Sequence, residues 1–143
     1  QEFFVYGTLN QPVHAVNLSD ITDFISRNHP FALVIAIDAS LGDERHLGYV
    51  TIGNGSLYPG AAVQKDLRLW GDIYITGIVN IAGILEYLTL QTTRLSTVIT
   101  LADTIAQGIL GNLYNNTANR SFHFHLPYAY LAYHFFEFPK GFL

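Results

Sequence analysis

The sequence predicts an α/β domain in which a mixed, mainly parallel sheet is flanked by helices. The first observation is the almost continuous apolar run from Phe31 to Asp38, which is bounded by turn residues. Such a run is typical of a strand that is buried on both faces of a sheet. The second is a stripe of apolar residues at helical spacing, namely Leu95, Val98, Ala102, Ile105 and Ile109. With 143 residues, the chain has the length of one domain with a single core.

The first elements are predicted to form a strand-helix-strand unit. Residues 3–9 have the composition of a short strand, and Asn17 or Ser19 supplies the polar residue that begins a helix. This helix is expected to end at residues 28–30, where Asn, His and Pro follow one another. The strand 31–38 comes next, so the simplest arrangement is a right-handed parallel crossover.

The pattern changes after Asp38. Residues 41–46 form a polar turn, and residues 47–53 have the pattern of another strand. The gap is too short for a helical crossover, so strands 31–38 and 47–53 are predicted to be antiparallel neighbours. A loop over 54–71 then leads to a strand over 72–79.

Helical periodicity begins at Ile81, and the apolar stripe predicts a helix that ends near Leu113. The remainder of the chain is dense in aromatic residues and is expected to form strands or a short helix. Because so apolar a segment cannot stay solvated, it is expected to pack on the domain or on another subunit. We therefore divide the chain into a domain at 1–114 and an aromatic extension at 115–143.

Composition limits the possible partners. The formal net charge of −4 disfavours nucleic acid as a partner. Half of the residues are hydrophobic and 13% are charged, which favours self-association into a homo-oligomer. No segment has the uninterrupted apolar length of a membrane span. The chain has no cysteine, which excludes disulfides, thiolate catalysis and thiolate metal sites.

Several long motifs resemble a known family. They are Val5-Tyr-Gly-Thr-Leu-Asn-Gln-Pro-Val-His-Ala-Val-Asn17, Ile35-Ala-Ile-Asp-Ala39, Tyr58-Pro-Gly-Ala-Ala-Val63, Gly71-Asp-Ile-Tyr-Ile-Thr-Gly-Ile-Val-Asn80 and Glu86-Tyr-Leu-Thr-Leu-Gln-Thr-Thr-Arg-Leu95. Together they closely resemble the YyaC-type sporulation proteins of spore-forming bacteria, over residues 4–112 and in the same order.

The resemblance implies a fold, an activity and a location. This family resembles the spore germination protease and, more distantly, the hydrogenase maturation endopeptidases, which implies a three-layer phosphorylase/hydrolase-like fold. Germination protease carries an aspartate in an Ala-Ile-Asp-Ala setting and a Pro-Gly loop, which Asp38 and the Pro59-Gly60 loop match. The implied location is the cytoplasm of a sporulating cell or spore.

The chain also departs from these relatives. The resemblance implies a second acidic residue, which lies in a Gly-Thr-Asp-Arg-Ser-Thr-Gly-Asp segment that precedes the motifs found here. This sequence does not contain that segment. The first strand and helix of the fold are therefore expected to be missing with it.

Asp38 is the first candidate for catalysis. The tip of a buried strand is where α/β proteins gather functional groups, and peptide hydrolysis by carboxylates needs two of them with separated pKa values. Candidates for the second group are Asp72, Asp43 and Glu44, although a solvated turn is the simpler interpretation of each. The alternative for Asp38 is a structural aspartate that accepts backbone N–H groups.

The remaining candidates are for ligand binding and for a metal site. His14 either lines a cleft or is a hydrogen-bonded, partly buried histidine, and Asn80 either caps a helix or lines a cleft. Pro59 and Gly60 are candidate binding residues through the resemblance. His123, His125 and His134 could form a three-imidazole metal site, but aromatic-rich strands often carry interfacial histidines, so we expect no metal and no cofactor.

Three functions remain open. The first is a sporulation-associated, carboxylate-dependent endopeptidase, or an impaired relative, acting on a protein or peptide substrate. The second is a non-catalytic structural or self-assembling protein on the same fold. The third is a metal-linked maturation endopeptidase.

Overall fold

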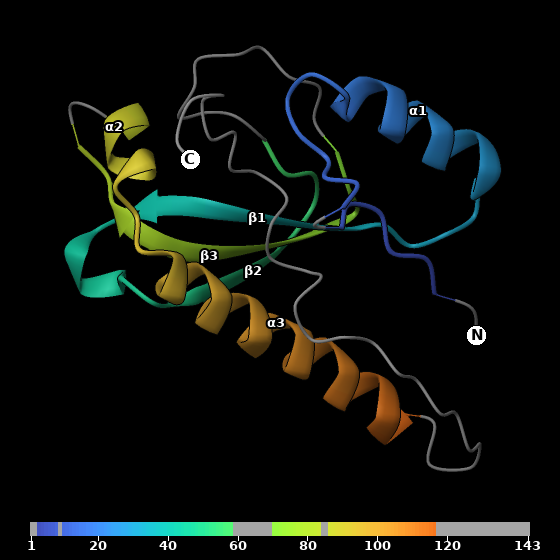
Figure 1. Cartoon of the computed structure of the whole chain (residues 1–143). Helices are drawn as coiled ribbons and strands as arrows, with labels where there is room; N and C mark the ends of the chain where they lie inside the picture. Colours follow the sequence, from blue (N-terminus) through green and yellow to red (C-terminus); the bar gives the residue numbers. More distant parts are fainter. Residues whose placement is uncertain (1–2, 9, 59–69, 84–85, 117–143) are drawn as a thin grey trace.

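A computed structural model gives the structure of the protein and describes residues 3–8, 10–58, 70–83 and 86–116. Figure 1 shows the strands side by side with helices on both sides of them. In chain order the elements are α1 (Leu18–Asn28), β1 (Ile35–Gly42), the 3-10 helix η1 (Glu44–His46), β2 (Val50–Asn54), β3 (Ile73–Ile81), α2 (Glu86–Gln91) and α3 (Leu95–Asn116).

The described strands form one mixed sheet with the order β1-β3-β2. β1 pairs with β3 in parallel, and β2 pairs with β3 antiparallel. The α/β class and the mixed sheet are thus confirmed, but the prediction that strands 31–38 and 47–53 are neighbours is wrong. β3 lies between them because it is the most apolar strand: Ile75, Ile78 and Val79 are buried, as a central strand requires.

β1 is displaced along the chain from the predicted strand. It begins at Ile35 and continues to Gly42, whereas Phe31 lies in a turn with 99% of its surface exposed. The apolar run therefore covers both the approach to the strand and its first half. As a consequence, Asp38 lies in the middle of β1, opposite Thr76 of β3, and not at the strand tip.

The predicted strand at residues 3–9 is not found in residues 3–8. Instead, Thr8 and Gln11 close a turn through two backbone hydrogen bonds of 2.9 and 3.1 Å. The described chain therefore contains α1 followed by β1, without the first strand of the predicted crossover. α1 begins after Asn17 and ends before His29, close to the predicted limits.

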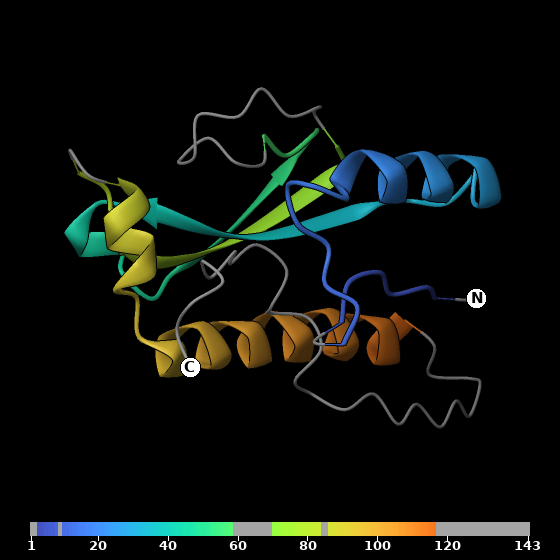
Figure 2. The same cartoon turned by 45° about the horizontal axis from the view of Figure 1, so that its top comes forward.

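α3 covers one face of the sheet and forms the main core with it. Its residues Val98, Leu101, Ala102 and Ile105 are buried, so the predicted stripe is largely confirmed, although Leu95 is 50% exposed. The helix packs over Gly77 of β3, where a Cβ atom would lie 3.4 Å from the Leu101 side chain, an ordinary van der Waals distance. Figure 2 shows α1 and α3 on opposite sides of the sheet.

The helical region differs from its predicted limits. β3 continues to Ile81, and two separate helices follow, with a break at residues 92–94. α3 continues to Asn116, beyond the predicted end at Leu113. Most of the extension at 115–143 lies outside the described residues, so its packing stays a prediction. Among the described helices, none combines the length and apolar character needed to cross a bilayer.

Candidate functional site

A row of polar side chains crosses the sheet on the face turned away from α3. Asp38 of β1 is paired with Thr76 of β3, which is paired in turn with Thr51 of β2. Residues in register lie on the same face, and successive residues alternate between faces. Because Ala39 packs on the α3 core cluster, Asp38 and its row lie on the opposite face. The Thr51 and Thr76 hydroxyl groups are hydrogen-bonded to each other.

The surroundings of Asp38 favour its protonated form. Burial raises the pKa of the Asp38 carboxyl group to about 8, although the hydrogen bond from the Ala39 backbone N–H opposes this shift. That hydrogen bond to Oδ1 is 2.7 Å long. The side chain is partly buried but retains accessible surface. A carboxyl group with this pKa carries its proton near neutral pH and can donate it.

The three predicted partner carboxylates lie away from Asp38. Asp72 precedes Thr76 by four residues, which corresponds to about 13 Å along a strand. Its Oδ2 accepts the Val34 backbone N–H at 2.9 Å. Asp43 and Glu44 follow the far end of β1, in the turn that contains η1. Hydrogen bonds from Arg45 lower the pKa of Asp43. In all three cases the residue belongs to a turn or a strand end.

His14 and Asn80 have local hydrogen-bond partners. His14 is partly buried and its Nδ1 accepts the Val16 backbone N–H at 3.3 Å. Asn80 joins the end of β3 to the helical region, because its Nδ2 donates to the Thr89 carbonyl at 3.0 Å and to Thr93 Oγ1 at 3.2 Å. A binding role for either residue stays a prediction.

Two groups of candidate residues lie outside the described residues. The first is the candidate binding pair Pro59 and Gly60, and the second comprises the candidate metal ligands His123, His125 and His134. In the part of the chain that the structure describes, no group of three metal-ligating side chains is brought together. The binding role of the Pro-Gly loop and the metal-linked interpretation both stay predictions.

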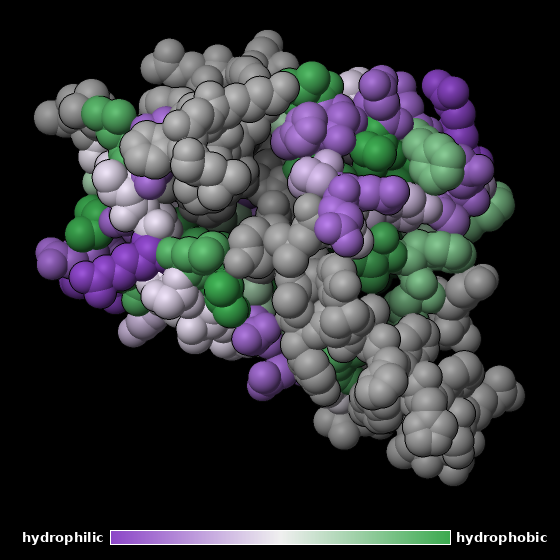
Figure 3. Space-filling view, viewed as in Figure 1, coloured by the Kyte–Doolittle hydropathy of each residue, from purple (hydrophilic) through white to green (hydrophobic). Residues whose placement is uncertain are grey.

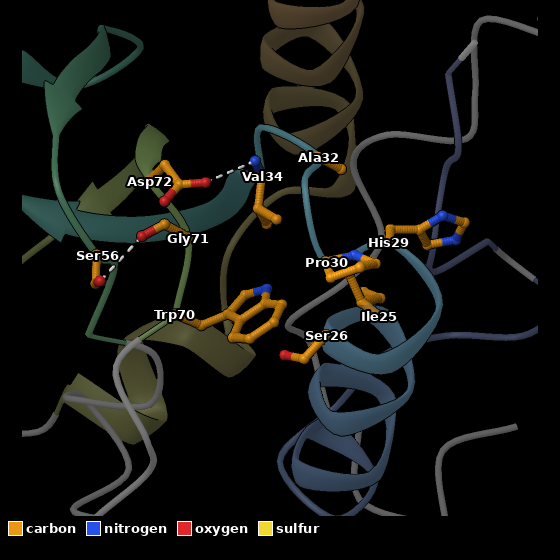
Figure 4. A pocket seen from close by; sticks show the side chains of 10 residues that line it. All are labelled: Ile25, Ser26, His29, Pro30, Ala32, Val34, Ser56, Trp70, Gly71 and Asp72. Atoms are coloured by element: carbon orange, nitrogen blue, oxygen red, sulfur yellow. Dashed lines mark hydrogen bonds between the residues drawn. The ribbon is translucent and has the colours of Figure 1, made fainter.

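The structure adds a pocket that the sequence did not indicate. It has a volume of about 370 Å³ and lies between α1 and the amino ends of β1 and β3. Figure 4 shows its lining, which comprises Ile25, Ser26, His29, Pro30, Ala32, Val34, Ser56, Trp70, Gly71 and Asp72. Asp38, His14 and Asn80 are not among these residues.

Gly71 lies in the pocket wall and close to β1 of the sheet. It has a φ of 95°, which favours glycine, and a Cβ atom there would lie 2.9 Å from the Ala36 side chain. Ala36 and Asp38 are two residues apart on β1 and therefore share a face. The pocket and the polar row thus lie on the same face of the sheet. Trp70, the single tryptophan of the chain, lines the pocket, but no spacing in the sequence relates it to the other lining residues.

Comparison with known proteins identifies the family. Residues 1–108 match the family model described as "Protein of unknown function (DUF1256)". The chain belongs to this family. It is 50% identical over 107 residues to the "Uncharacterized protein YyaC" of Bacillus subtilis (strain 168), which confirms the predicted YyaC-type membership. The match covers 75% of this chain and 52% of that protein, so the chain spans about half the length of its curated relative. No solved structure matches the chain.

Proposed function

We propose that this DUF1256 chain belongs to a sporulation-associated, carboxylate-dependent peptidase in which Asp38 is the proton donor. The observation that carries the proposal is a partly buried carboxyl group with a pKa of about 8 in the middle of a sheet. Strongly shifted pKa values of this kind are concentrated at functional sites. The resemblance to germination protease supports the reaction, the three-layer fold and a location in the sporulating cell or spore.

The polar row gives Asp38 a suitable setting for peptide hydrolysis. A second carboxylate would remove a proton from water, which attacks the peptide carbonyl carbon. Asp38 would then give its proton to the amine that leaves when the C–N bond breaks. The second carboxylate has to be a residue other than Asp72, Asp43 and Glu44, which belong to turns or strand ends away from Asp38. The hydroxyl groups of Thr76, opposite Asp38, and of Thr51, on the next strand, can hydrogen-bond the substrate backbone.

The Asp38→Asn variant tests this proposal, because the amide keeps the shape of the carboxyl group and cannot donate an acidic proton. We expect its rate of peptide cleavage to fall by roughly 100- to 10,000-fold, the range for loss of a general acid. The full-length protein is incubated with a mixture of unstructured peptides, and the products are measured by mass spectrometry. Asp43→Asn, at an exposed carboxylate in the turn after β1, is the matched control and should cleave normally. Undiminished cleavage by Asp38→Asn would refute the proposal.

A second candidate is a self-assembling protein without catalysis, and exposed apolar side chains favour it. Phe31 is 99% exposed and Leu33 is 67% exposed on the segment that leads into β1, which is an edge strand of the described sheet. Apolar side chains also reach the surface between the polar ones around α1 (Figure 3). Open edges and exposed apolar patches are the features that associate with another chain.

A further inference from the structure

The pocket beside α1 contains the carboxylate of Asp72, which can accept more hydrogen bonds than it does. Oδ2 of Asp72 accepts the Val34 backbone N–H, as the dashed line in Figure 4 shows. The ion pairs formed within the described residues are Arg27–Asp23 and Arg45–Asp43, so Asp72 has no cationic partner among them. Its side chain is exposed at the pocket. Among the described residues, the negative charge of Asp72 therefore has no cationic partner in the pocket.

The neighbouring hydroxyl groups add acceptors and not donors. Ser26 Oγ donates its proton to the Thr22 carbonyl at 2.9 Å, and Ser56 Oγ donates to the Gly71 carbonyl at 2.9 Å. Each oxygen keeps lone pairs that can accept a hydrogen bond from a ligand. With Asp72, the lining thus offers acceptors at three points.

The Trp70 indole supplies the apolar part of the pocket. Figure 4 shows its ring directed into the space between Ser26 and Gly71. An aromatic face binds both aliphatic stems and cations. A ring beside a carboxylate and several acceptors is complementary to a positively charged group with N–H donors.

We propose that this pocket binds an ammonium or guanidinium group on an aliphatic stem, as in a lysine or arginine side chain. The stem would lie on Trp70, and the charged end would donate hydrogen bonds to Asp72, Ser26 and Ser56. The volume of about 370 Å³ is sufficient for a group of this size.

The substrate role of this site depends on the proposed peptidase function. Val34, at the pocket, precedes Asp38 by four residues, or about 13 Å of extended strand, on the same face of the sheet. An extended peptide that lies along this face would place a basic side chain in the pocket about four residues from the bond beside Asp38. The pocket would then select substrates with a basic residue at that distance.

The single tryptophan gives a direct measure of binding. The full-length protein is titrated with Nα-acetyl-arginine methylamide, and Trp70 fluorescence is recorded. We expect a saturable change, and no saturable change with the neutral isostere Nα-acetyl-citrulline methylamide. We expect Asp72→Asn to weaken arginine-amide binding at least tenfold, because it removes the charge from the ion pair. Its amide oxygen can still accept the Val34 N–H, and circular dichroism would verify its fold. Asp43→Asn is the control and should bind normally.

Two further ligands test whether the bound cation belongs to a peptide or to a free amine. Tighter binding of an extended peptide with one arginine than of free agmatine would support a peptide subsite, whereas equal affinity would support a pocket for free amines. Equal binding of the citrulline compound, or full affinity in Asp72→Asn, would overturn the proposal. The result is independent of catalysis, because Asp38→Asn should retain the fluorescence response even where it abolishes cleavage. Conversely, cleavage without a basic preference and without a fluorescence change would refute the pocket assignment alone.

Discussion

At the scale of the residue, the burial of Asp38 has a consequence for stability as well as for chemistry. The folded pKa of about 8 lies far above the ordinary value of 3.8. Between these values the folded state keeps a proton that the unfolded state has lost. The free energy of unfolding therefore falls as pH rises through this range, by at most about 1.4 kcal/mol per pH unit from this group. The stabilising contribution is fully present below the unfolded pKa and is lost toward pH 8.

The Asp38→Asn variant isolates this contribution. Asn does not titrate, so the stability of the variant relative to the natural chain should increase between pH 5 and pH 8 by on the order of 1 kcal/mol per pH unit. Urea unfolding at several pH values measures the difference, and groups that titrate in both proteins cancel. A difference that is constant with pH would show that Asp38 is ionised in the folded state. Asp43→Asn should give a difference that stays constant between pH 5 and pH 8, because the pKa of Asp43 is lowered from 3.8 and the group is ionised in both states over that range.

At the scale of the element, helices and apolar strands could be predicted from local pattern, but their pairing could not. The residues of α1 and α3 carry their own periodicity, and the apolar runs around Ala36 and Val79 indicated strands. The order β1-β3-β2 depends on which strand is buried on both faces, and a short connection between β1 and β2 gives no information about that. Asp38 lies at a strand centre and not at a strand tip for a different reason, since β1 continues past it to Gly42 through its pairing with β3.

The contact between α3 and the sheet should carry much of the stability. Leu101 is 5% exposed and packs against Val79 and Val98, whereas Leu95, on the same helix, is 50% exposed. Leu101→Ala leaves a cavity and is expected to lower the free energy of unfolding by about 2–5 kcal/mol. Leu95→Ala is the matched control and should change it by less than about 1 kcal/mol. Urea unfolding of both variants tests the packing, and equal losses would contradict it.

At the scale of the whole molecule, the candidate sites differ in how far the sequence could reveal them. Asp38 could be selected because a carboxylate interrupts an apolar run, although its raised pKa depends on the neighbours that the fold supplies. The pocket could not be selected, since its lining comes from α1, the approach to β1 and the two segments that flank residues 59–69. Trp70 and Asp72 meet Ser26 through folding alone, and no spacing in the chain records that contact.

The exposed approach to β1 leads to a prediction for the assembly of the molecule. If a second chain covers Phe31 and Leu33, Phe31→Ser removes apolar area from the interface and should shift the protein toward the monomer. Sedimentation velocity over a series of protein concentrations measures the change. Val16→Ser alters another exposed apolar residue, 73% exposed in the turn before α1, and should leave the association unchanged. A natural chain that stays monomeric at every concentration would contradict association through this edge. Peptide cleavage by that monomer would then favour the peptidase over the self-assembling protein.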